Sequence, residues 1–465
     1  MAILIILLAL FFLMFVAYRG FSVILFAPVA ALAAVALTQP GHVLPFYSGI
    51  FMEKMVGFVQ LYFPVFLLGA IFGKLIELSG FARSITRAII GVVGGGRAML
   101  AIVLVGAILT YGGVSLFVVA FAVYPFAAEL FRAADIPKRL VPATIALGAF
   151  TFTMDALPGT PQIQNIIPTT FFKTDNWAAP RLGIIGGVFV FLVGMAFLEW
   201  RRAAARRAGE GYGDGHLQEP EPIAEEQRLA HPLVAISPLV AVGLLNKLFG
   251  VVIPRHYGPK FDFAAAGVKG VAAVDVSKIT GVWAVEGALL VGVLLVLALG
   301  FGRIRAQFTR GVNASIGGSL LATINTASEY GFGGVIASLP GFLAVKNAIG
   351  HTFHYPLVNE SVTTTALAGI TGSASGGMSI ALAAMGATYL EQAQRMGISP
   401  QVLHRVAAMA SGGMDTLPHN GAVITLLTIT GLTHRQSYKD IFALTLIKTS
   451  AVFVIIGVYF LFGIV

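Results

Sequence analysis

Met154-Asp155-Ala156-Leu157-Pro158 recurs later in the chain as Met414-Asp415-Thr416-Leu417-Pro418. Upstream of these phrases, Gly112-Gly113-Val114-Ser115-Leu116 is echoed by Gly376-Gly377-Met378-Ser379-Ile380. The serine precedes the aspartate by 40 residues in the first copy and by 36 in the second, a difference of about one helical turn. Two phrases in the same order at nearly the same spacing indicate an internal duplication. Because both copies lie in apolar sequence, they predict a binding site of the kind that membrane transporters place between their repeats.

The composition is that of an integral membrane protein. The 465 residues are 57% apolar and 11% charged, with a mean hydropathy of +0.87, whereas a soluble domain carries about 25% charged residues. The absence of cysteine excludes disulfides, thiolate nucleophiles and cysteine-ligated metals. The net charge of +9 resides in short loops, so we attribute it to membrane topology rather than to nucleic-acid binding. The first apolar run, 3–18, lacks a preceding Lys or Arg and a clear cleavage site, which favours a membrane helix over a signal peptide.

Short apolar arms around a glycine break predict a re-entrant hairpin in each half. The first hairpin is expected at about 98–131, with its break at Tyr111-Gly112-Gly113, and the second at about 357–391, with its break at 372–377. Each arm is shorter than, or close to, the roughly 20 residues that a spanning helix needs. Irregular backbone at membrane depth is tolerated where it is buried in protein or lines a cavity.

A broken membrane helix follows each hairpin. The first is expected at about 139–172 and the second at about 402–431, because the prolines and glycines of 155–161 and 415–421 cannot continue an α-helix. We therefore predict an all-α polytopic membrane protein with a first repeat at 1–199, a flexible cytoplasmic linker at 200–231 and a second repeat at 232–465. The other helices are expected at about 3–18, 21–38, 56–78, 182–199, 232–253, 279–301, 311–330 and 441–464, with interfacial segments at 79–97 and 331–356.

The distribution of Lys and Arg predicts that the repeats are inverted. With the linker placed inside and each hairpin returning to its side of entry, the inner loops are richer in positive charge than the outer loops. The first hairpin then enters from the cytoplasm and the second from outside. Opposed repeats of this kind are the arrangement that alternating access requires.

Asp155 and Asp415 are the candidates for coupling to a proton or another cation. An ionised carboxylate at membrane depth costs at least about 2.5–3.5 kcal/mol unless it is paired or hydrated, so such residues usually carry function. The alternative is that each aspartate caps a helix end. Glu77 and Glu329 fall near helix ends, where an interfacial structural role is expected, and Asn359 and Glu360 are weaker candidates.

Substrate contacts are expected at the hairpin tips and just beyond the breaks. Half-helices expose N–H groups at their N-termini, where an anion is favoured, and the polar side chains beyond the breaks suit hydroxyl and carboxylate oxygens. The alternative for the small residues is close packing of the tips. The candidate substrate-binding residues are Tyr111, Gly112, Gly113, Ser115, Thr160, Gln162, Asn165, Ser373, Ser375, Gly376, Gly377, Ser379, His419 and Asn420.

Two other classes of function fit less well. A channel needs a continuous wet path, whereas opposed hairpins favour an occluded site. An intramembrane hydrolase built from Ser411, His419 and Asp415 would not require the same phrase in both halves, and the common hydrolase, metalloprotease and P-loop motifs are missing from the sequence. We expect no enzyme activity, no cofactor and no metal site.

Over nearly its whole length the chain resembles the gluconate:proton symporter (GntP) family of the ion transporter superfamily. The resemblance rests on Tyr111-Gly112-Gly113, on the stretch from Leu157 to Pro161 with the run to Phe172, and on the stretch from Asp415 to Gly421. It implies a scaffold domain and a mobile transport domain, elevator-type uptake of small hydroxy-carboxylates with protons across a bacterial inner membrane, and a homodimer.

The chain departs from the gluconate branch at the first break. That branch has a histidine-containing stretch where this chain has Leu157-Pro158-Gly159-Thr160-Pro161. The chain is more similar to members described as β-hydroxybutyrate permeases, which implies a small hydroxy-monocarboxylate as substrate. Gluconate or another sugar acid stays open as the substrate, and so does sodium as the coupling ion.

Overall fold

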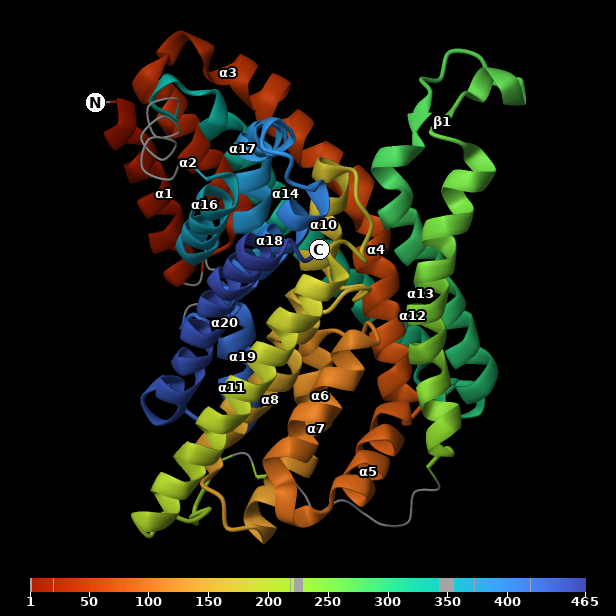
Figure 1. Cartoon of the computed structure of the whole chain (residues 1–465), viewed down its shortest axis with the longest axis vertical. Helices are drawn as coiled ribbons and strands as arrows, with labels where there is room; N and C mark the ends of the chain where they lie inside the picture. The colour runs from red at the N-terminus through yellow and green to blue at the C-terminus, as the bar shows by residue number, and fades with distance from the viewer. Residues whose placement is uncertain are drawn as a thin grey trace.

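The computed structural model describes residues 2–19, 21–217, 219–220, 229–342, 355–371, 373–418 and 420–465. Its regular structure is almost entirely helical, which confirms the all-α expectation. The strands found in the described residues are β1 (Lys260–Phe261) and β2 (Val274–Asp275), which pair antiparallel in the loop between two long helices. That loop lies at one end of the molecule (Figure 1).

The first half of the chain runs through the first hairpin and the first broken helix. Its helices are α1 (Ala2–Tyr18), α2 (Val23–Thr38), α3 (Val43–Phe46), α4 (Met52–Leu78), α5 (Phe81–Val93), α6 (Ala98–Tyr111), α7 (Leu116–Ala133), α8 (Val141–Ala149), α9 (Phe152–Asp155), α10 (Ile163–Phe172) and α11 (Pro180–Arg207). Short helices of other types are η1 (Pro40–His42), η2 (Tyr47–Phe51), η3 (Gly95–Arg97) and η4 (Lys138–Leu140).

The second half contains longer helices before its own hairpin and break. Its helices are α12 (Pro232–Tyr257), α13 (Val276–Ile304), α14 (Phe308–Ser338), α16 (Pro356–Thr371), α17 (Ala374–Arg395), α18 (Pro400–Gly412), α19 (Gly421–Thr430) and α20 (His434–Phe462), with the short helices η5 (Phe263–Ala266) and η6 (Gly413–Thr416).

Five helical stretches in the described residues are long and apolar enough to cross a membrane. They are Pro40–Leu78, Pro180–Arg207, Pro232–Tyr257, Val276–Ile304 and His434–Phe462. Among the shorter apolar helices, Ala98–Tyr111 belongs to the first hairpin and Gly421–Thr430 to the second broken helix. The chain is therefore a multi-pass membrane protein in which half-length pieces lie among full-length spans.

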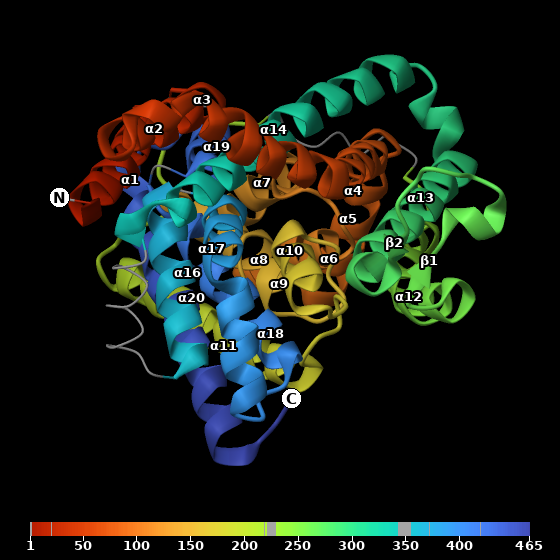
Figure 2. The same ribbon diagram turned by 90° about the horizontal axis from the view of Figure 1, so that it is seen from above.

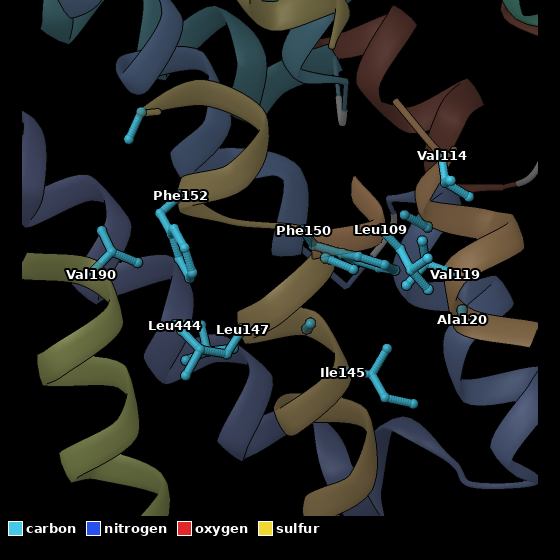
Figure 3. Packing of buried hydrophobic residues seen from close by; sticks show 14 of the residues in the cluster. Leu109, Val114, Val119, Ala120, Ile145, Leu147, Phe150, Phe152, Val190 and Leu444 are labelled. Atoms are coloured by element: carbon cyan, nitrogen blue, oxygen red, sulfur yellow. The ribbon is translucent and has the colours of Figure 1, made fainter. Parts of the chain in front are cut away.

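The half-length pieces occupy the middle of the molecule. Seen from above, α8, α9, α10, α17 and α18 lie centrally, and the pairs α1–α2 and α12–α13 lie at opposite ends (Figure 2). The hairpin arms α6 and α7 contact each other, as do α16 and α17. Leu147 of α8 and Leu444 of α20 point toward one another in the buried core, where Phe150 faces Leu109 and Val119 of the first hairpin (Figure 3).

Helix α14 differs from the sequence expectation. The interfacial segment expected at 331–356 begins instead within α14, which is continuous to Ser338. Because small residues at Gly331 and Gly334 approach Phe51 and Lys54 closely, α14 packs tightly along the antiparallel α4, and these contacts continue the helix where the sequence predicted its end. The remainder of the expected segment, 343–354, lies outside the described residues.

The linker between the halves is partly structured. Helix α11 extends to Arg207, and the residues after it, which we call the strap (208–217 with 219–220), are held against the first half. Tyr212 N–H donates to Asp135 Oδ1 at 2.9 Å, and Lys138 Nζ is 2.7 Å from Glu219 Oε1. The expectation of a flexible linker is therefore wrong for this part, because its acidic residues meet the basic loop after the first hairpin. Residues 221–228 lie outside the described residues.

Candidate functional site

The first hairpin tip turns where the glycine pair predicted it. Helix α6 ends at Tyr111, Gly113 adopts φ +97°, and Ser115 is the N-cap of α7. A side chain is strained at that φ, so Gly113 is required by the backbone of the turn. The Ser115 side chain makes no capping hydrogen bond, which leaves the N-terminus of α7 to other acceptors.

The first tip is tied to the first break. Tyr111 OH donates to Pro158 O at 2.8 Å. Gln162 Nε2 donates to Thr110 O at 2.8 Å and reaches Val114 O at 3.4 Å. Hairpin and break are therefore joined through backbone carbonyls that a regular helix would have satisfied itself.

The second tip is shorter than expected. Helix α16 ends at Thr371 and α17 begins at Ala374, so Gly376 and Gly377 lie in the first turn of α17 rather than in the break. Their small size serves packing, because a Cβ at Gly377 would lie 2.2 Å from the backbone of Ala368 in the other arm. Ser373 is the N-cap and accepts from Gly376 N–H at 3.1 Å.

Ser379 does not open the second arm, which corrects the expectation drawn from its likeness to Ser115. It lies within α17, is buried, and its hydroxyl donates to Ser375 O at 2.6 Å. A hydroxyl that bonds back to its own helix is less available to a ligand. Ser375 remains at the tip, where its hydroxyl is 3.4 Å from that of Ser373.

The two breaks meet at Asp415. Gln164 Nε2 donates to Asp415 Oδ2 at 3.1 Å, and the backbone N–H of Ala374 also hydrogen-bonds to this carboxylate. Because Gln162 contacts the first tip and Gln164 contacts Asp415, two side chains at the start of α10 connect the first tip to the second. The helices that begin at this connection, α10 and α17, lie centrally in the view from above (Figure 2).

Asp155 has a different partner from Asp415. Its Oδ2 lies 3.7 Å from Lys448 Nζ of α20, and both side chains are buried. Lys448 also donates to Phe150 O at 2.7 Å, and it interacts electrostatically with both aspartates. Gly412 gives Asp155 its space, since a Cβ there would lie 1.6 Å from Oδ2. Among the described residues, Lys448 lies within ion-pair distance of Asp155 but not of Asp415, on which it acts from farther away.

Several expected substrate contacts instead hold the breaks together. Asn165 Nδ2 donates to Thr160 O at 3.0 Å, and its Oδ1 accepts from Arg405 at 3.0 Å. Asn420 caps α19, because its Oδ1 accepts from Ala422 N–H at 2.7 Å. A break leaves backbone groups without helical partners, and these amide side chains satisfy them. Thr160 itself is buried, at the centre of the first break.

Three functional side chains were missed by the sequence reasoning. Arg405 is fully buried in α18 and donates to Ala178 O and to Asp155 O, which binds the first break to the second broken helix. Lys448 and Gln164 are the other two. The sequence did contain a signal for Lys448 and Arg405. Each lies in an apolar helix, and a charged residue at membrane depth usually has a partner there.

His419 lies outside the described residues, so its expected contact is not placed. The hydroxyl of Ser411 donates to Ala408 O at 2.8 Å within α18. Among the described residues, no group of three His, Cys, Asp or Glu side chains could hold a metal ion.

No family model matches the chain. YxjC of Bacillus subtilis (strain 168), named an uncharacterized transporter, is 60% identical over 473 aligned positions that span 100% of both proteins. The Alcanivorax borkumensis YdaH transporter, whose structure is described as having an unusual topology, matches with a TM-score of 0.51 and 16% identity over 92% of this chain and 90% of its own. Neisseria gonorrhoeae MtrF, described within a class of antimetabolite efflux pumps, matches with a TM-score of 0.52 and 13% identity over 90% of this chain and 83% of its own.

The two solved structures share the fold at low identity, and both are helical membrane transporters. The relation to YxjC is much closer, since it covers both chains from end to end. The protein belongs to the family of membrane transporters that includes YxjC.

Proposed function

We propose that the protein is a secondary active transporter that imports a small hydroxy-monocarboxylate resembling 3-hydroxybutyrate together with protons, by alternating access. The observation that carries the proposal is the polar connection from the first tip through Gln162 and Gln164 to Asp415 and the second tip. Transporters place their substrate where discontinuous helices from two repeats meet, and this is such a meeting point.

The first tip is the better place for the substrate carboxylate. At the second tip, the N–H of Ala374 is already bonded to Asp415, and Gly376 N–H to Ser373. At the first tip, Ser115 leaves the N-terminus of α7 uncapped by its side chain, and the charge of Arg405 acts on neighbouring Tyr111. An anion is favoured at an unfilled helix N-terminus with a cation nearby, and disfavoured beside a second carboxylate.

Asp155 and Asp415 are our candidates for the coupling proton. Asp155 faces Lys448, so a proton on Asp155 would leave Lys448 as a free positive charge close to the substrate. A carboxylate that enters as an anion compensates that charge. This reciprocal relation gives a physical reason for proton and anion to travel together, whereas a sodium ion would compete with Lys448 for the same oxygens.

The wider setting of the proposal follows the family resemblance. The protein resides in a bacterial inner membrane with its strap in the cytoplasm, it moves its hairpins and broken helices as one transport domain in an elevator motion, and it works as a homodimer. It belongs with the gluconate:proton symporters, in their β-hydroxybutyrate branch. The weak polarity of the first break, with Leu157 and Pro158, supports a substrate with a single hydroxyl over a sugar acid.

Uptake of labelled 3-hydroxybutyrate into proteoliposomes tests the proposal. We expect accumulation with an inward proton gradient, none with sodium alone, and little inhibition by unlabelled gluconate. Strong inhibition by gluconate would assign the chain to the sugar-acid branch. Accumulation driven by a sodium gradient would identify sodium, rather than the proton, as the coupling ion. Vesicles loaded with labelled substrate test the opposite direction. Net export from them would mean that the protein is an exporter, like the efflux class that includes MtrF.

The coupling residues are tested in the same vesicles. Asp155→Asn and Asp415→Asn should each abolish the dependence of uptake on the proton gradient, with exchange of labelled for unlabelled substrate retained by at least one of them. Glu77→Gln is the control, because Glu77 pairs with Lys74 on the partly exposed surface of α4. If both asparagine variants keep the normal dependence on pH, the aspartates do not carry the proton.

A further inference from the structure

Glu329 lies where the sequence did not place it. A helix-end, interfacial position was expected, but the residue is inside the continuous α14 and is only 3% exposed. Its carboxyl faces the tip of the second hairpin, since a Cβ on Gly376 would lie 1.5 Å from Glu329 Oε2. Ser373 hydrogen-bonds to the same carboxyl group. The acid therefore meets the N-terminal turn of α17, as Asp415 also does.

The surroundings of Glu329 are apolar. Along α14, Phe332, Val335 and Ile336 pack with Phe51 and with Ile380 of α17 in one buried cluster. Glu329 Oε2 is buried, and it has no hydrogen-bond partner among the described residues. A buried oxygen without a partner is costly for a neutral acid and far more costly for an ionised one.

In the part of the chain that the structure describes, no cation forms an ion pair with Glu329. In the described residues, the ionisable groups on the elements around it are Tyr47 of η2, Glu53, Lys54, Tyr62, Lys74 and Glu77 of α4, Arg310 and Tyr330 of α14, Tyr389, Glu391 and Arg395 of α17 and Asp415 of η6, and α2 has none. Within the described part of the chain, none of these forms an ion pair with Glu329; Lys54 packs instead against Gly334, and Asp415 adds a like charge at the same tip.

We propose that Glu329 and the tip of the second hairpin form a proton-binding site, in which the bound proton keeps the hairpin closed against α14. In the closed form the acid is buried without a cation, so this form binds the proton more tightly than an open form in which water reaches the carboxylate. By linkage, loss of the proton favours opening of the tip. A proton is the fitting ligand, because one carboxyl and one hydroxyl are too few oxygens for a metal ion.

This site is distinct from the pair of aspartates. Asp155 faces Lys448 and Asp415 is held by Gln164, whereas Glu329 comes from α14, which packs along α4 and α2. The role of the proton as a gate rests on the proposed transport function. The proton site itself does not, so it is tested without any substrate.

The test uses the natural absence of cysteine in the chain. Ser375→Cys places a single thiol at the second tip, and Ser115→Cys places one at the first tip, each in the full chain in proteoliposomes. The rate of labelling by a membrane-permeant maleimide is measured from pH 6 to pH 9, and the ratio of the two rates removes the general titration of thiols. We expect the ratio to rise with pH by up to about tenfold per unit, the maximal slope for one proton.

Variants decide whether Glu329 causes that rise. Glu329→Gln, a permanent mimic of the protonated acid, should give slow labelling at the second tip and a ratio independent of pH. Glu77→Gln should leave the rise unchanged. A flat ratio in the native background, or a normal rise in Glu329→Gln, would overturn the proposal. If Glu329→Gln does not accumulate, Glu329→Asp must shift the midpoint of the rise, and an unmoved midpoint would overturn it equally. A protein with the expected labelling but no carboxylate uptake would contradict the proposed function alone.

Discussion

The two hairpin tips derive from the same phrase, yet they are filled differently. At the second tip, Asp415 and Glu329 both meet the start of α17, and the N-cap Ser373 is engaged. At the first tip, the charge that acts on Tyr111 among the described residues is that of the cation Arg405. The second tip is thus occupied by the protein's own acids, and the first is the place that we propose for an anionic substrate.

The difference shows how a duplicated motif acquires two roles. Asp155 and Asp415 occupy corresponding positions in sequence, but among the described residues only Asp155 lies within ion-pair distance of a lysine, Lys448 of α20. The two copies share a similar backbone, whereas the charged neighbours of each aspartate come from other helices and differ between the copies. Two tips with different charged neighbours suit the binding of an anion and a proton at the separate places that we propose.

The largest expected effect comes from removing the cation of the first break. Lys448→Gln leaves Asp155 as a buried carboxylate without its partner, and breaking a buried pair in this way costs about 3–5 kcal/mol. Asp415→Asn should cost less, because its amide oxygen still accepts from Gln164 and Ala374. Thermal unfolding in detergent, followed by light scattering and tryptophan fluorescence, measures both.

The double variant Asp155→Asn with Lys448→Gln is the control for that pair. With both charges removed, most of the lost stability should return, since no uncompensated charge stays buried. If the Lys448→Gln variant has the same unfolding temperature as the native protein, the two residues do not form the pair on which the comparison depends. The same conclusion follows if the double variant is as unstable as Lys448→Gln alone.

The glycines of the two tips give the next largest effect. Gly377→Ala would force a methyl group to within 2.2 Å of the Ala368 backbone, which cannot move as a side chain can, so we expect a loss of about 3 kcal/mol or more. Gly113→Asn in the first tip should cost less, about 1–2 kcal/mol, because asparagine tolerates positive φ better than other side chains and its Cβ would meet only side-chain atoms, with Pro161 Cγ at 3.1 Å. Melting temperatures of the two variants, each beside the native protein, measure the difference.

Equal losses in these two variants would contradict the distinction between a glycine needed for close approach and one needed for φ. A stable Gly377→Ala protein would show that the arms of the second hairpin are not in contact at this point. Gly421→Ala is a suitable control at a neighbouring glycine, where a Cβ meets no atom within 4 Å.

Local signals in the sequence are enough for the helical class and for the ends of many elements. The glycine pair after Tyr111 and the prolines after Asp155 stop a helix wherever they stand, whatever surrounds them. Long-range partners carry no such local mark. The pairing of Asp155 with Lys448, almost 300 residues later in the chain, depends on how α20 packs, and only the rarity of a lysine inside an apolar helix hinted at it.

Resemblance between repeats misled where the two copies differ in register. Ser379 follows Gly376-Gly377 as Ser115 follows Gly112-Gly113, but α17 begins before its glycines and α7 begins after them. The same residue type is therefore inside a helix in one copy and at an N-cap in the other. Glu329 was misplaced for a related reason, because the Gly331-Phe332 that follows it suggested a helix end, and contacts with α4 continue the helix instead.

The smallest expected effect lies at the base of the first hairpin, where the strap is anchored. Partial burial alone would raise the pKa of Glu219, but hydrogen bonds and charges from Lys138, Tyr212 and Arg132 outweigh it, and the pKa of Glu219 is lowered. The hydrogen bond from Arg139 likewise lowers the pKa of Glu210. Both contributions to stability are present above the ordinary glutamate pKa of about 4.3 and are lost as the pH falls through the lowered values.

Glu219→Gln should cost about 1 kcal/mol at neutral pH, because Lys138 is buried and loses its counter-charge, and nearly nothing once the native glutamate is protonated. Glu210→Gln, at a more exposed pair with Arg139, should cost about half as much, and added salt should remove most of that. Protease cleavage within the strap, followed from pH 7 to pH 4 at low and high salt, measures both. An effect of Glu210→Gln that exceeds that of Glu219→Gln, or that resists salt, would mean that charge at the exposed end of the strap, rather than the buried lysine, fixes the base of the first hairpin.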